Sequence, residues 1–219
     1  MWAIGTLCTG VVARGEAAEA SAADAASGIR AALERGAVAA VGLLGQQDGF
    51  LGNPKVRIEL PGSLKDAARL LKLIGQQHRV DELVTAMNRA AEAAVPEAKA
   101  MLIAAVKSIG VGDARRIISG GEDSVTTFFA SKTRVPLGEK FLPIVERETA
   151  RVDLAARYNA VAGKAAGMGL VKGDDANIER YVTRKTLDGL YFMIGEEEKK
   201  IRRDPIGTGS ALLARVFGK

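Results

Sequence analysis

The residues most capable of chemistry are two acidic residues on one predicted helix near the C-terminus, Asp188 and Glu198. At about 100° per residue, Glu198 falls only about 20° from Leu187, so the helical phase places its carboxylate on the apolar side. Two carboxylates in different surroundings are the basis of general acid–base hydrolysis. A buried carboxylate can also hold helices together by a salt bridge, and Arg202, one turn after Glu198, is the expected partner. We favour the structural interpretation and keep Asp188, Glu198 and Arg202 as candidate binding residues.

A turn-rich segment, Asp48–Pro54, is the second place where a polar ligand could be held. Asp48 supplies a carboxylate and Asn53 an amide, and two glycines between them leave main-chain groups free. The segment lacks the spaced acidic and amide ligands of a calcium loop. Phe50 and Leu51 lie between the two turns, and the favoured interpretation is that they fill the core.

Composition argues against several kinds of site. The sequence has one cysteine, Cys8, and one histidine, His78, so it has no Cys/His cluster for zinc and no Glu-x-x-His pair for a di-iron centre. No glycine-rich segment has the spacing of a phosphate loop. His78 lies in a polar stretch between two predicted helices, and we interpret it as a solvated side chain. We therefore expect no metal and no cofactor.

The charge of the chain is mildly basic. Lys and Arg number 31 against 26 Asp and Glu, which gives a formal net charge of +5. Basic and acidic residues alternate along most of the predicted helices, which is typical of solvated helix surfaces. Nucleic-acid binding is therefore not expected.

One segment, Val56–Leu60, has the periodicity of a strand, because every second residue is apolar and those between are charged. Its main-chain groups need partners, and three alternatives are open. The segment could pair with Gly169–Lys172 in a two-stranded ribbon. It could lie along the helices as an extended strap, or it could offer an open edge to a strand of a partner protein.

The rest of the chain has helical periodicity and is rich in alanine, the strongest helix former. We predict an all-α, bundle-like fold with at most a small two-stranded β element near residues 55–60. Pro136 and Pro143 are expected to separate helices. No linker divides the chain, so residues 23–219 are predicted to form a single domain. The expected helices are Ser21–Leu44, Leu64–Ile74, Val80–Ala94, Pro96–Ser108, Asp113–Ser119, Glu122–Thr133, Ile144–Ala166, Asp175–Arg203 and a short one containing Leu212.

Residues 1–22 have the features of a signal peptide without its basic start. Met1–Val12 is apolar and uncharged but too short to span a membrane. The small residues that follow, with Ala18, Ala20 and Ala22 at alternate positions, fit a signal-peptidase site. We expect export to the periplasm or beyond, and the alternative is an N-terminal helix of a cytoplasmic protein.

Several stretches together resemble a bacterial family, domain of unknown function 4197. They are Asp48–Pro54, Met87–Lys99, Phe141–Val145, Leu187–Glu198, Ile201–Pro205 and Val216–Gly218. The resemblance extends from about residue 25 to the end of the chain. It implies a signal peptide, which members of the family usually carry, and it implies no known activity. The N-terminus departs from the family by lacking the basic start.

These observations favour an exported, non-enzymatic binding or scaffold module of the cell envelope. One alternative is a hydrolase-like enzyme that uses Asp188 and Glu198 in a cleft. Another is a lipid-handling or peripheral membrane protein that uses the Gly/Ala-rich first helix. A pocket converging on the two carboxylates would favour the enzyme, and an apolar tunnel between helices would favour lipid.

Overall fold

The structure of the chain is all-α. The computed structural model describes residues 12–121, 124–167 and 173–204. Within these residues the chain forms helices and no strand, which confirms the predicted fold class. The α-helices are α1 (Val12–Leu44), α2 (Gly62–Leu73), α3 (Gln77–Ala94), α4 (Ala98–Lys107), α5 (Val111–Ser119), α6 (Ser124–Thr149), α7 (Asp153–Gly167) and α8 (Ile178–Arg203), and the 3-10 turns are η1 (Val95–Glu97) and η2 (Gly173–Ala176).

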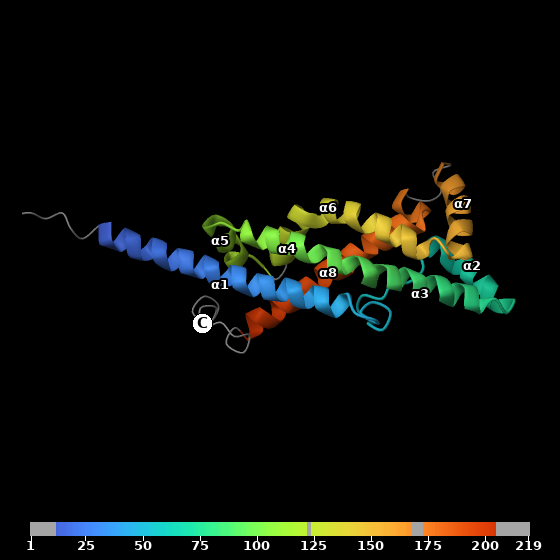
Figure 1. The fold of residues 1–219 in the computed structure, drawn as a ribbon, viewed down its shortest axis with the longest axis horizontal. Helices are drawn as coiled ribbons and strands as arrows, with labels where there is room; N and C mark the ends of the chain where they lie inside the picture. The colour runs from blue at the N-terminus through green and yellow to red at the C-terminus, as the bar shows by residue number, and fades with distance from the viewer. Residues whose placement is uncertain (1–11, 122–123, 168–172, 205–219) are drawn as a thin grey trace, which may run out of the picture.

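The long helices lie roughly lengthwise in an elongated molecule (Figure 1). α6 packs on both α3 and α8, and α1 packs on α8 and α4. The start of α1 extends beyond the other helices at one end, whereas α2 and α7 lie at the opposite end. Phe50, Phe129 and Phe141 are the largest fully buried side chains, and two of them, Phe129 and Phe141, belong to α6.

Helix α6 runs through Pro136 and Pro143, so the prediction that these prolines separate helices was wrong. Each proline removes one helical hydrogen bond. The buried residues of α6 instead recur at every fourth position and form one continuous ridge that packs against α3 and α8. Both prolines lie off this ridge, where water can solvate the freed carbonyls. The buried ridge comprises Val125, Phe129, Thr133, Leu137, Phe141, Val145 and Thr149.

The segment Val56–Leu60 lies outside the helices and is not part of a sheet among the described residues, so the small β element that the prediction allowed is not seen there. A side-chain amide takes the place of a neighbouring strand. The Ile58 N–H donates to Asn88 Oδ1 at 2.8 Å, and Asn88 Nδ2 donates to the Ile58 carbonyl at 2.9 Å. The alternating burial is confirmed, because Val56, Ile58 and Leu60 are buried. The suggested pairing partner, Gly169–Lys172, lies outside the described residues.

The predicted signal peptide covers residues 1–22. Residues 1–11 lie outside the described part of the chain, and α1 begins at Val12. Among the helices that the structure describes, none combines the length and the apolar character that crossing a bilayer requires.

Candidate functional site

A buried ion pair holds α5, α6 and α8 together. The Glu198 side chain on α8 is only 3 % exposed, and Arg202 Nε donates to its Oε1 at 2.9 Å. Arg202 Nη2 also donates to Ser124 Oγ and to the Ile117 carbonyl, both at 2.9 Å. Ser124 Oγ in turn donates to the Ile117 carbonyl at 3.0 Å. The burial of Glu198 and its pairing with Arg202, both predicted from helical phase, are confirmed.

Burial raises the pKa of Glu198, and Arg202, Ser124 and the Val125 main chain oppose that shift. The second carboxylate oxygen, Oε2, is buried and has no hydrogen-bond partner among the described residues. Glu198 borders a narrow, apolar cavity of about 20 Å³ that α1 closes with Ile29 and Leu33. This space admits a water molecule at most, so Glu198 does not face a substrate cleft.

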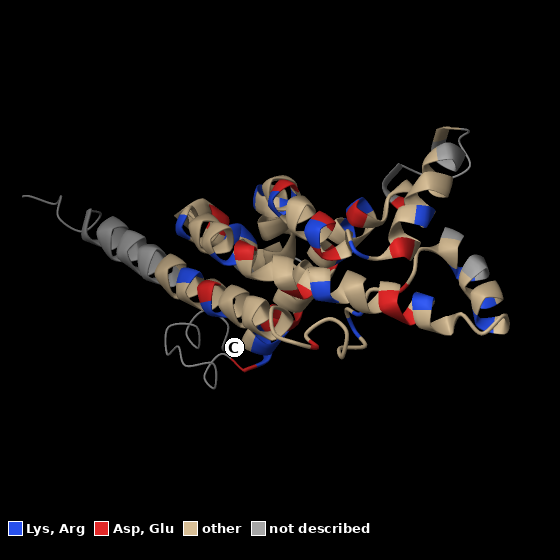
Figure 2. Ribbon diagram, turned by 45° about the vertical axis from the view of Figure 1, so that its right-hand side comes forward, with Lys and Arg blue, Asp and Glu red and all other residues tan. Residues whose placement is uncertain are grey.

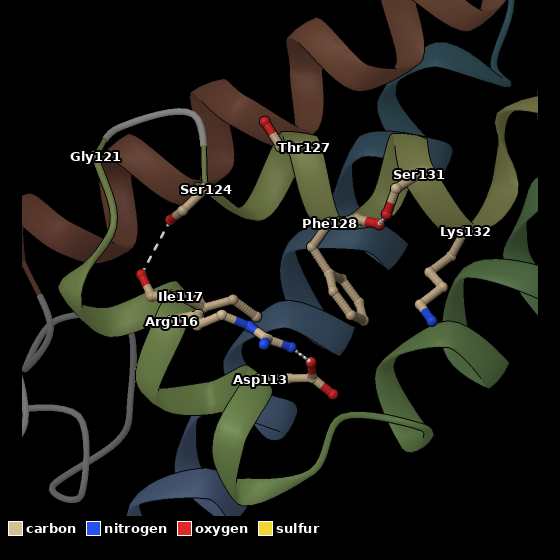
Figure 3. Close-up of a pocket in the computed structure, with 9 residues that line it drawn as sticks. All are labelled: Asp113, Arg116, Ile117, Gly121, Ser124, Thr127, Phe128, Ser131 and Lys132. Atoms are coloured by element: carbon tan, nitrogen blue, oxygen red, sulfur yellow. Dashed lines mark hydrogen bonds and ion pairs between the residues drawn. The ribbon is translucent and has the colours of Figure 1, made fainter.

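A larger pocket of about 560 Å³, lined by both polar and apolar side chains, lies between α5 and α6 (Figure 3). Phe128 and Lys132 extend from α6 toward the Asp113–Arg116 ion pair of α5. Ser124 lies at one end, so the pocket adjoins the buried ion pair of Glu198. The full lining is Asp113, Arg116, Ile117, Gly121, Ser124, Thr127, Phe128, Ser131 and Lys132.

Hydrogen bonds at the start of α5 hold Asp113 in a fixed place in the pocket. Asp113 Oδ2 accepts from the Gly110 N–H at 3.2 Å, where α5 begins, and Oδ1 accepts from Arg116. These hydrogen bonds, helped by the charges of Arg116 and Lys132, hold the pKa of Asp113 below its usual value. Asp113 is therefore ionised, and the described lining residues comprise two cations and this one anion. Lys132 itself has no salt-bridge partner among the described residues.

Asp188 does not share a site with Glu198. The two residues are ten positions apart on α8, which separates them by about 15 Å along the axis. Asp188 is 43 % exposed and accepts from Arg134 at 3.0 Å, and Arg134 in turn lies over the Tyr191 ring at 5.0 Å. The structure thus brings Glu198 and Arg202 together and leaves Asp188 in a separate surface pair.

Side chains of α3 hold the Asp48–Pro54 segment in place by hydrogen bonds. Glu92, 5 % exposed, accepts from the main-chain N–H groups of Phe50 and Leu51, both at 3.0 Å. Arg89 bridges Glu92 and Asp48, donating to Asp48 Oδ1 at 2.8 Å. Phe50 is completely buried, as the favoured interpretation expects. Its ring lies against Gly189 of α8, where an added Cβ would come within 2.8 Å of it.

Asn53 also has a local role in the structure. Its Oδ1 accepts from the Lys55 N–H at 3.1 Å, and its carbonyl accepts from the N–H groups of Val56 and Arg57. Both polar candidates of this segment therefore stabilise the turn, and a role for Asp48 or Asn53 in ligand binding stays a prediction.

The model of the family described as Protein of unknown function (DUF4197) matches residues 19–218. The chain belongs to this family. No curated protein and no solved structure matches the chain. Among the described residues of this DUF4197 member, no cluster of His, Cys, Asp or Glu could hold a metal ion.

The structure of this DUF4197 chain reveals polar residues that sequence reasoning missed. Asn88 is fully buried, and Glu92 nearly so, although they lie in a helix whose apolar face is obvious. Asn88 falls about 40° from the buried Val84, so helical phase could have flagged it. Arg116 and Lys132 of the pocket gave no such signal, because lone basic residues are ordinary on helix surfaces.

Proposed function

We propose that this protein is a non-enzymatic binding module of the cell envelope that holds a small, negatively charged ligand in the α5–α6 pocket. The observation that carries the proposal is the pocket itself. Its volume of about 560 Å³ suits a small molecule. Its described lining residues combine two cations and one anion with hydroxyl groups and one aromatic ring, a chemistry that suits an organic anion.

Each part of the pocket has a distinct task in this proposal. Lys132 supplies a point charge for a carboxylate or phosphate, and Arg116 supplies planar donors beyond those that bind Asp113. The Phe128 ring offers an apolar face for a ring or short chain. Thr127 and Ser124 also line the pocket.

The position of Ser124 favours binding over catalysis. Its hydroxyl donates to a main-chain carbonyl and accepts from Arg202. The single histidine of the chain does not line the pocket, so no imidazole is present to activate this hydroxyl. The hydrolase alternative lacks geometric support among the described residues, because Asp188 and Glu198 lie apart.

The location in the envelope is supported by the apolar, uncharged Met1–Val12 and by the small residues after it. N-terminal sequencing of protein purified from its native source tests the location. The native chain should begin between Ala17 and Asp24. An intact Met1 on the native protein contradicts export by cleavage.

Ligand binding is tested by thermal shift with three probes: benzoate, phenyl phosphate and the neutral analogue benzamide. The two anions should raise the melting temperature, and benzamide should not. Lys132→Gln should abolish the shift. Lys140→Gln, an exposed lysine two turns further along α6 and outside the pocket, is the matched control and should retain it. Equal shifts in both variants, or none with either anion, would refute the proposal.

A further inference from the structure

Helix α2 has a second apolar face that no described residue covers. Leu70, Leu73 and Ile74 are 65 %, 82 % and 68 % exposed, and their spacing places them together on one side of the helix. The opposite side carries the buried Leu64 and Ala68, which face α3. Only one of the two apolar faces of α2 is therefore buried in the fold, and the other remains exposed to solvent.

Basic residues lie between these two apolar faces. Lys65, Arg69 and Lys72 share one flank of α2 and line a groove of about 260 Å³ against α3 and the Val56–Leu60 segment. The other charged residues of this groove are Arg57, Glu59 and Asp81, so cations outnumber anions among the lining residues that the structure describes. Lys65 and Lys72 have no ion-pair partner among the described residues. The sequence of α2 contains a single acidic residue, Asp66, so the helix has a net positive charge.

The position of α2 allows a flat surface to approach it. The helix lies at the end of the molecule opposite the start of α1 (Figure 1). Figure 2 shows basic residues at that end, with acidic residues of the neighbouring segments close to them. The α5–α6 pocket lies away from this end, so an occupant of α2 would leave the pocket open.

We propose that α2 docks the protein on an anionic lipid bilayer. Leu70, Leu73 and Ile74 enter the boundary between headgroups and acyl chains, and the basic flank contacts lipid phosphates. This is the arrangement of an interfacial helix, in which an apolar face and adjacent cations act together. The charge distribution favours a bilayer over a second copy of the chain, because pairing α2 with itself would bring the basic flanks of two copies together.

The inference is independent of the proposed ligand pocket and differs from a lipid role for the first helix. It assigns the membrane contact to α2. Nothing in it requires a helix to cross the bilayer.

The test is flotation of the full chain with vesicles of equal parts phosphatidylglycerol and phosphatidylcholine, compared with phosphatidylcholine alone. The protein should float with the anionic vesicles only, and added salt should weaken the binding. Leu73→Ser should weaken it on the order of tenfold, because one apolar side chain no longer leaves water. Combining Lys65→Gln with Lys72→Gln should weaken it about 25-fold, since each cation near the surface contributes about fivefold.

Val135→Ser is the matched control, because this valine is 72 % exposed on α6, away from α2. This variant should bind vesicles like the unaltered protein, and a melting curve checks that every variant is folded. Equal binding to neutral vesicles, no binding to anionic ones, or full binding by Leu73→Ser overturns the proposal. So does a chain that dimerises through Leu73 and ignores vesicles, which would identify a second copy as the occupant.

Discussion

Replacing Asn88 by alanine should be among the most damaging single changes on α3. The Asn88 side chain satisfies both main-chain groups of the buried Ile58 and also donates to the Val84 carbonyl at 2.8 Å. Val84 lies in the same helix and keeps its helical hydrogen bond in the variant. The Ile58 N–H and carbonyl would both lose their partner.

Each orphaned buried group costs about 1–3 kcal/mol. Two such groups predict a loss of about 3 kcal/mol, toward the lower end of their sum, because the exposed neighbours Arg57 and Glu59 let some water reach the segment. In a protein of this size that loss lowers the melting temperature by about 6–12 °C. It is a large fraction of the stability of an ordinary domain.

Urea denaturation followed by far-ultraviolet circular dichroism measures this loss directly. Asn53→Ala is the matched control, because Asn53 lies in the adjoining turn and its side chain makes one exposed hydrogen bond. It should cost less than about 0.5 kcal/mol. Asn88→Asp should be at least as damaging as Asn88→Ala, since a carboxylate would face two carbonyl oxygens. A loss below about 1 kcal/mol for Asn88→Ala would show that the amide does not hold the segment.

Three further predictions concern α8 and its contact with Phe50 of the Asp48–Pro54 segment. Glu198→Ala should cost about 3 kcal/mol because it removes the buried carboxylate that Arg202 Nε binds, and replacing both residues with leucine should recover much of that loss in thermal melts. The raised pKa of Glu198 means that the folded state holds this proton more tightly than the unfolded chain. Relative to Glu198→Gln, the protein should therefore gain stability as the pH falls from 7 toward the unfolded value of 4.5, and a loss over that range would contradict the assignment. Gly189→Ala should destabilise by about 1–3 kcal/mol, because its Cβ would press on the Phe50 ring, and an unchanged denaturation midpoint would show that the ring yields freely.

Helical phase and alternation predicted which side of α8 and of the Val56–Leu60 segment is buried. Glu198 lies on the apolar side of α8 and pairs with Arg202 one turn later. Both features depend only on residue spacing within one helix, so they could be predicted from the sequence. The burial of Val56, Ile58 and Leu60 likewise followed from alternation within the segment. The partner of Ile58 did not, because Asn88 is 30 residues away and a side-chain amide imitating a strand has no periodic signature.

Local rules failed where distant contacts decide the outcome. Pro136 and Pro143 indicate helix ends by every local rule, yet the ridge of buried residues keeps α6 continuous. The α5–α6 pocket could not be predicted either. Asp113 and Lys132 come from different helices, and only the packing of those helices places their charges on one cavity.

The main-chain amides of Phe50, Leu51 and Ile58 all end on side chains of α3. Their hydrogens are therefore shielded from deuterium exchange without belonging to any helical ladder. They can exchange when the segment lifts away from α3 while α3 itself stays folded. The three amides should thus exchange together, with one shared opening free energy below that of the α3 amides, and so report on a sub-global motion that thermal or urea melts cannot separate from global unfolding.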